Sequence, residues 1–241
     1  MSIALKLAEI RERMAGAARR AGRKPEEIAL MAVSKTHPAT AILEALAAGQ
    51  TLFGENRVQE FAGKRDEVAS ASTQAKVHLI GHLQSNKAAK AVELFDGVDS
   101  VDSLKLAERL NEAAERMGKQ LDVLIEINVG GEEAKTGLAP TSNELYALLD
   151  GRARLSSLTI RGCMTVPPFT EDPEGARGYF RQLRELREGL RARGGLELEE
   201  LSMGMSHDFE VAIEEGSTCV RVGTAIFGSR SYPAPYEEPA Q

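Results

Sequence analysis

Apolar residues recur along this chain in two alternating patterns, one typical of helices and the other of short buried strands. Residues 3–22 carry apolar side chains at helical spacing, and the short apolar run from Ile28 to Val33 follows between Pro25 and Pro38. A run of that length bounded by prolines predicts a buried strand. The same pair of patterns then repeats, and it predicts eight strands, at residues 28–33, 52–56, 76–81, 98–101, 123–129, 158–166, 196–203 and 218–222.

Helical segments separate these strands. Strict alternation of strand and helix implies parallel strands joined by right-handed crossovers. We expect the helices at residues 40–48, 58–69, 85–95, 103–117, 141–150, 173–193 and 206–215, with a short one after residue 224.

Eight such units in 241 residues match the size of a closed barrel. An open doubly wound sheet would need a glycine-rich fingerprint after the first strand, but that turn reads Ser34-Lys35-Thr36-His37-Pro38. The predicted fold class is therefore α/β, a single (β/α)8 TIM barrel with an extra N-terminal helix. No shift of composition marks a linker, so residues 1–241 are expected to form one domain, and the Pro-rich residues 231–241 a flexible tail.

Composition and charge narrow the class of protein. The chain is 42% hydrophobic and 27% charged, and its net charge of −6 gives no footprint for nucleic acid or an anionic membrane. It contains neither a secretory signal nor a run of 18 apolar residues. Cys163 and Cys219 are far apart in sequence, which fits a reducing compartment. We therefore expect a cytoplasmic protein that binds neither nucleic acid nor membrane.

Polar or glycine-containing turns follow nearly every expected strand. In a barrel of this kind, the C-terminal ends of the strands carry the chemistry. Those ends are Ser34-Lys35, Glu55-Asn56, Gly81-His82, Asp99, Asn128, Met164-Thr165, Ser202-Met203-Gly204-Met205-Ser206 and Arg221-Val222-Gly223-Thr224. His78 and His82 lie on a strand and its turn rather than on one helix face, so we expect no zinc site there.

Lys35 ends the first apolar strand and would therefore start inside the barrel mouth. Burial disfavours an ammonium group and lowers the pKa of a lysine. A neutral amine attacks aldehydes, which indicates a Schiff base. The alternatives are a lysine that reaches the solvent at the rim and one that pairs with a carboxylate such as Glu55.

The turns after the seventh and eighth strands have the composition of a phosphate site. Gly204 and Gly223 allow backbone N–H groups to approach an anion, and Ser206 and Thr224 add hydroxyl donors. Two ordinary tight turns in which Ser and Thr cap the following helices would have the same composition without binding a phosphate. Arg221 cannot be neutralised and needs an acceptor. An amine, an anion cradle and an arginine together match the aldehyde, phosphate and pyridine nitrogen of pyridoxal 5′-phosphate (PLP).

Six ordered motifs along nearly the whole chain resemble a known family. The chain resembles the pyridoxal phosphate homeostasis proteins, also called proline synthetase co-transcribed homologues. The motifs are Ala32-Val-Ser-Lys-Thr-His-Pro38, Phe53-Gly-Glu-Asn-Arg-Val-Gln-Glu60, His78-Leu-Ile-Gly-His-Leu-Gln-Ser-Asn-Lys87, Gly162-Cys-Met-Thr-Val-Pro167, Ser202-Met-Gly-Met-Ser206 and Arg221-Val-Gly-Thr-Ala-Ile-Phe-Gly228.

The resemblance implies the barrel half of alanine racemase, called fold type III, and it implies roles for individual residues. Lys35 would form the Schiff base, Arg221 would face the pyridine nitrogen, and Asn56 would lie close to the cofactor. Neither Arg57 nor Lys135 receives a role. The full set expected to bind PLP is Lys35, Asn56, Ser202, Met203, Gly204, Ser206, Arg221, Gly223 and Thr224.

The resemblance also implies a function in intracellular vitamin B6 and amino-acid homeostasis without an established reaction. We expect a monomeric protein, not an enzyme, that stores PLP or delivers it to PLP-dependent apo-enzymes. One alternative is a single-domain fold type III enzyme such as an amino-acid racemase, although the sequence offers no convincing second acid/base group. The other alternative is a barrel whose phosphate site binds a sugar phosphate or a nucleotide phosphate instead of PLP, and in which Lys35 has only a structural role.

Overall fold

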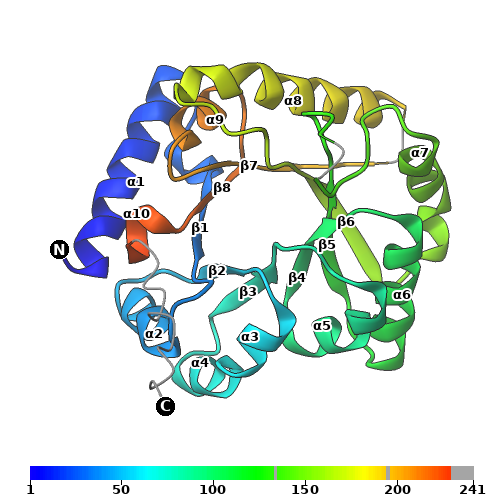
Figure 1. The fold of residues 1–241 in the computed structure, drawn as a ribbon, viewed down its shortest axis with the longest axis horizontal. Coiled ribbons are helices and arrows are strands. Elements are labelled where there is room, and N and C mark those ends of the chain that lie inside the picture. Colours follow the sequence, from blue (N-terminus) through cyan, green and yellow to red (C-terminus); the bar gives the residue numbers. More distant parts are fainter. Residues whose placement is uncertain (133–134, 194–195, 229–241) are drawn as a thin grey trace, which may run out of the picture.

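Eight parallel strands close into a barrel in the computed structural model, which describes residues 1–132, 135–193 and 196–228. Neighbouring strands pair in sequence order, and β1 closes the ring by pairing with β8 (Figure 1). The predicted α/β barrel with a leading helix is confirmed. The strands are β1 (Ala29–Val33), β2 (Leu52–Glu55), β3 (Lys76–Leu79), β4 (Gly97–Val101), β5 (Leu121–Glu126), β6 (Leu158–Met164), β7 (Glu200–Met205) and β8 (Cys219–Val222).

Helices surround the barrel on its outside (Figure 1). Within the described residues, no helix is long and apolar enough to cross a membrane. The α-helices are α1 (Ile3–Arg20), α2 (Ala39–Ala47), α3 (Val58–Ala62), α4 (Arg65–Ala71), α5 (Ala88–Leu94), α6 (Leu104–Arg116), α7 (Asn143–Asp150), α8 (Arg177–Ala192), α9 (Phe209–Glu214) and α10 (Thr224–Phe227). Short 3-10 turns are η1 (Pro25–Glu27), η2 (Ser85–Lys87), η3 (Gly151–Arg154) and η4 (Pro173–Ala176).

The main apolar core lies between the strands and this outer layer of helices. Fully buried side chains from helices and strands meet there, among them Leu7, Ile42, Phe53, Leu110 and Phe180. Burying such side chains is the dominant favourable contribution to folding. Because side chains alternate along a strand, the other face of each strand points into the barrel, where polar residues can meet.

The extra helix α1 covers the seam where the first and last strands pair. It packs against α2, α9 and α10. Ser2 caps its start by accepting a hydrogen bond from the Leu5 N–H. From the other end of α1, Arg20 forms an ion pair of 2.8 Å with Glu214 at the end of α9. The helix thereby joins the first and last units of the barrel.

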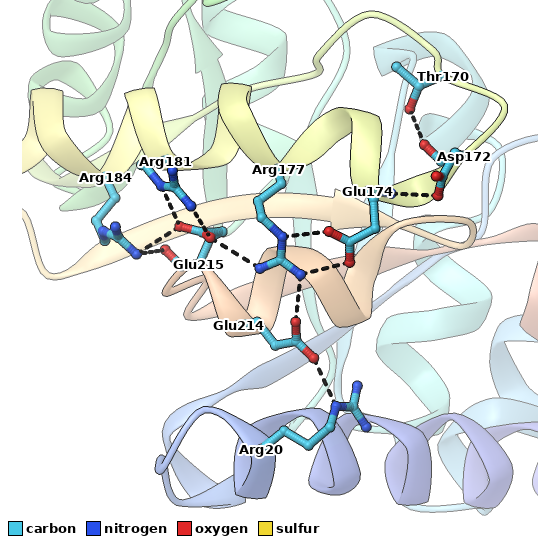
Figure 2. A network of polar contacts seen from close by, with 9 residues as sticks. All are labelled: Arg20, Thr170, Asp172, Glu174, Arg177, Arg181, Arg184, Glu214 and Glu215. Carbon is cyan, nitrogen blue, oxygen red and sulfur yellow. Dashed lines mark hydrogen bonds and ion pairs between the residues drawn. The ribbon is translucent and has the colours of Figure 1, made fainter.

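A cluster of arginines around Glu215 holds α8 and α9 together. The Glu215 side chain is only 7% exposed, and its carboxylate accepts hydrogen bonds from Arg177, Arg181 and Arg184 of α8 at 3.0–3.4 Å. Figure 2 shows these three arginines reaching across from α8. The arginines lower the pKa of Glu215 although burial alone would raise it. This arrangement fixes the segment that leads into β8.

The structure corrects the expected elements at three places. The helix expected over residues 58–69 is divided into α3 and α4 at Gly63 and Lys64. The strand expected at residues 196–203 is β7 at Glu200–Met205. Asp99, expected at a strand end in the mouth, lies in the middle of β4 and faces the opposite cavity. The predicted tail at residues 231–241 lies outside the described residues.

Candidate functional site

A cavity of about 400 Å³ lies at the C-terminal ends of the strands. That volume is within the usual range for small-molecule sites. Its apolar wall includes Val33, Ile80, Val166 and Met205. Its polar lining comes from segments far apart in sequence, at or just after the strand ends, namely Lys35, Thr36, His37, Asn56, Ser206, His207, Arg221 and Thr224.

Lys35 enters this cavity because of strand alternation. Met31, Val33 and Lys35 are spaced by two residues, and all three line cavities along the barrel axis. The turn after Lys35 is tight, since the His37 N–H donates to the Ser34 carbonyl at 3.1 Å. The lysine expected at the barrel mouth is therefore in the mouth.

Arg221 is held from below by neutral acceptors. It is 4% exposed and donates to the Ser202 hydroxyl of β7 and to the Thr165 carbonyl, each at 2.7 Å. Burial lowers the pKa of Arg221, yet an arginine remains protonated in proteins. Its partner strand also fixes its position, because Met31 of β1 is in register with Arg221 of β8. The site thus has a permanent positive charge beside the strand that carries Lys35.

The loops after β7 and β8 meet through Ser206. The Ser206 hydroxyl accepts from the backbone N–H groups of Gly223 and Ala225, at 3.3 and 3.5 Å. Asp208 holds the same loop by accepting from the Met205 N–H at 2.6 Å. At Gly223 a Cβ atom would lie 3.1 Å from the Val33 carbonyl oxygen, so a larger residue would crowd this corner of the cavity.

Six of the nine residues expected to bind a ligand line the cavity: Lys35, Asn56, Ser206, Arg221, Gly223 and Thr224. Ser202 lies one layer deeper and contacts Arg221. Met203 is fully buried in the core. Gly204 has a φ of +94°, and a Cβ there would lie 2.5 Å from the Ala212 Cβ, so this glycine lets α9 pack closely on β7.

Two histidines of the lining, His37 and His207, had no role predicted from the sequence. His37 stacks on Phe227 with ring centroids 5.2 Å apart, and burial, followed by the nearby charge of Lys64, lowers its pKa. His207 packs against Phe169, and its Nε2 lies 3.0 Å from the Glu171 carbonyl. Their positions, two residues after Lys35 and directly after Ser206, were the signal available in the sequence.

Residues left without a role also have defined places. Lys135 lines an adjoining cavity of about 310 Å³ and donates to the Pro167 carbonyl at 3.2 Å. Arg57 is exposed at the N-cap of α3. His78 and His82 pair separately, with Asp99 and Asp102, and the described ranges contain no group of His, Cys, Asp or Glu suited to a metal ion.

Comparison with known proteins places this geometry in a family. Residues 5–231 match the family model described as "Alanine racemase, N-terminal domain". The chain is 43% identical to the pyridoxal phosphate homeostasis protein of Aquifex aeolicus over 96% of this chain and 100% of the relative. It is 45% identical to the protein of that name from Escherichia coli K12, over 95% and 97% of the two chains.

Solved structures agree with these matches. The PLP-bound structure of PipY from Synechococcus elongatus superposes with a TM-score of 0.82 at 41% identity, over 94% of this chain and all of that one. An alanine racemase from Clostridium difficile gives a TM-score of 0.70 at 16% identity, over 97% of this chain and 58% of that one. At that identity the racemase supports the fold alone.

Proposed function

Since the chain belongs to the pyridoxal phosphate homeostasis family, we propose that it binds PLP through a reversible Schiff base at Lys35 and stores or delivers this cofactor. The observation that carries the proposal is the meeting of Lys35, Arg221 and the Ser206–Gly223 corner in one cavity of about 400 Å³. PLP itself would supply an aldehyde that condenses reversibly with an amine.

The residues of the cavity fit the three functional groups of PLP. Lys35 supplies the amine, and Arg221 supplies a fixed donor that suits an unprotonated pyridine nitrogen. Gly223, Thr224 and Ser206 would hold the phosphate, since their backbone and hydroxyl groups lie at one corner where a Cβ on residue 223 would be crowded by Val33. Asn56 lines the same wall. Ser202, Met203 and Gly204 would support this corner from below.

The same arrangement favours holding a cofactor over turnover. Arg221 is buried and permanently charged, so it opposes protonation of a pyridine nitrogen and weakens the electron sink on which PLP catalysis depends. Ile80, Val166 and Met205 give one side of the cavity an apolar lining. We therefore propose a monomeric carrier that passes PLP to apo-enzymes and is not itself an enzyme.

Borohydride reduction followed by peptide mass spectrometry tests the proposal. Reduction of the PLP-treated protein should leave a pyridoxyl label on Lys35, and Lys35→Ala should lose both the label and the visible absorption band. Lys135→Ala is the matched control, because Lys135 is a second lysine beside the mouth, and it should keep the label. A label on Lys135 alone, or no label at all, would contradict the assignment.

Chiral analysis separates this proposal from the racemase alternative. The protein is incubated with PLP and single L-amino acids, and the D-isomer is measured over time. A carrier gives no turnover, whereas a racemase turns over at about 1–10³ per second. Mixing the loaded protein with a PLP-dependent apo-enzyme, and comparing its activation with that by free PLP, tests delivery.

A further inference from the structure

A buried ion cluster outside the barrel wall contacts the peptide groups on both sides of Lys35. We propose that this cluster, made of Ser34, Glu55, Glu60 and Lys64 and named here the Lys64 cluster, positions Lys35 for its reaction with the cofactor. The proposal rests on the proposed function of Lys35. Lys64 and Glu60 are positioning residues in this view, since they act on Lys35 through its backbone.

Lys64 reaches the residue before Lys35. Its ammonium group donates to the Ser34 carbonyl at 3.4 Å, to Glu55 Oε1 at 3.0 Å and to Glu60 Oε1 at 2.8 Å. Glu55 Oε1 also accepts from the Ser34 hydroxyl at 2.7 Å. The main chain of Ser34 is therefore bound to Lys64 and its side chain to Glu55, and these two charged groups are themselves paired.

Glu60 reaches the residue after Lys35. Its Oε1 accepts a hydrogen bond from the Thr36 N–H. Thr36 has a φ of +67°, in the left-handed region that a β-branched residue rarely adopts. Such a conformation persists only where the surroundings enforce it. The Glu60 carboxylate, itself anchored by Lys64, is an enforcing contact at this residue.

The burial of the cluster makes its contacts costly to lose. The Glu55 side chain is fully buried and that of Lys64 is 11% exposed. Burial raises the pKa of Glu55, while Lys64 and Ser34 act in the opposite direction. Glu55 Oε2 has no hydrogen-bond partner among the described residues. Loss of Lys64 would leave both carboxylates without their cation in a low-dielectric site.

The break between α3 and α4 is what brings Lys64 inward. Gly63 ends α3, and Lys64 occupies the N-cap position of α4 with a φ of −112°. From this position between the two helices, the Lys64 side chain reaches the Ser34 carbonyl at the end of β1. The charge of Lys64 also lowers the pKa of His37, after the effect of burial. The cluster therefore acts on two residues of the cavity lining.

Three substitutions separate positioning from general stability. Lys64→Met removes the cation, and Lys64→Arg restores charge and donors. Lys119→Met is the matched control, because Lys119 also donates to two backbone carbonyls, those of Val92 and Glu93, but lies away from the mouth. We expect Lys64→Met to release PLP about tenfold faster than the unchanged protein, with recovery toward its rate in Lys64→Arg.

Amide hydrogen exchange on the protein without cofactor provides an independent readout. Exchange in the peptide around Thr36 should rise in Lys64→Met and stay unchanged in Lys119→Met, at matched thermal stability. Equal release rates and equal exchange in the two methionine variants would overturn the positioning role. If the unchanged protein takes up no PLP, the proposed function fails on its own, and the exchange result alone decides the role of the cluster.

Discussion

The two ends of the barrel differ in size and charge, and the smaller end carries the candidate site. The cavity at the N-terminal ends of the strands has about 980 Å³, against about 400 Å³ at the mouth. Its lining has seven acidic side chains against two lysines, Lys76 and Lys119, and this excess of negative charge would repel a phosphate. The acidic residues there are Glu26, Glu27, Asp96, Asp99, Asp122, Glu199 and Glu200. Charge and fixed donors, rather than volume, distinguish the candidate site in this barrel.

The two ends also differ in how they stabilise a buried charge. At the mouth, Arg221 is held by neutral acceptors and keeps its charge available to a ligand. At the other end, His78 pairs with Asp99 at 2.9 Å, so those charges satisfy each other. Arg221 can therefore still pair with an acceptor on a ligand, whereas His78 and Asp99 already pair with each other.

The largest expected effect comes from removing the cation of the mouth. Arg221→Met leaves the Thr165 carbonyl and the Ser202 hydroxyl without their donor, and should lower the free energy of unfolding by about 3 kcal/mol. It should also weaken PLP binding by about 10- to 100-fold. Arg161→Met, at the opposite end beside Glu200, is the control and should cost under about 1 kcal/mol. Urea unfolding and PLP titration measure both, and equal PLP affinities would contradict the comparison.

Gly97 at the acidic end and Gly223 at the mouth allow the two cavities to be compared by adding a methyl group to each. In Gly97→Ala the new Cβ would lie 2.8 Å from the His78 ring, which should cost about 1–3 kcal/mol and leave PLP affinity unchanged. In Gly223→Ala it would crowd the Val33 carbonyl oxygen, and PLP affinity should fall about tenfold. Thermal melts and PLP titrations of both variants provide the measurement. The opposite pattern would place the ligand at the acidic end.

The His78–Asp99 pair predicts a pH dependence of stability. Burial alone would lower the pKa of His78, but Asp99, with smaller effects of Glu200 and Asp96, raises it above the ordinary value. A raised pKa contributes stability below the unfolded value of about 6.5, and this is lost as pH rises through the folded pKa. Asp99→Asn should therefore cost about 2 kcal/mol near pH 6 and less at high pH. A cost independent of pH in urea unfolding would refute this.

The smallest effect is expected from neutralising the acidic end. Asp122→Asn combined with Glu26→Gln reduces its negative charge without touching the mouth. PLP affinity should change by less than about twofold, because charges at that range are screened by salt. A clear gain in affinity, measured by fluorescence titration, would mean that the acidic cavity competes for the phosphate.

Much of the architecture follows from sequence pattern. The alternation of apolar runs and helical segments predicted all eight strands and the closed barrel, because strand and helix periodicities differ clearly in this chain. Lys35 was found because it follows the first apolar run, and Arg221 because it is a charged residue inside the last run, two residues before Gly223. The apolar pattern of the neighbouring residues thus predicts where a residue lies along a strand.

Contacts between segments far apart in sequence could not be predicted from the apolar pattern. The periodicity of residues 58–69 continues through Gly63, so it hid the break that turns Lys64 toward Ser34. Asp99 was misplaced because it lies in the middle of β4 and not at the C-terminal end of that strand, so it lines the opposite cavity. A register shift in β7–β8 accompanies the placement of Ser202 and Met203 beneath the cavity. Such irregularities depend on packing against neighbouring strands.

The pairing of β1 with β8 gives the site an order of assembly. Lys35 follows the first strand of the ring, whereas Arg221 belongs to the last, and the two become neighbours only through the register of Met31 with Arg221. While the polypeptide emerges from the ribosome, the amine exists long before its arginine does. In the proposed site, the amine and the arginine therefore come together only when the ring closes.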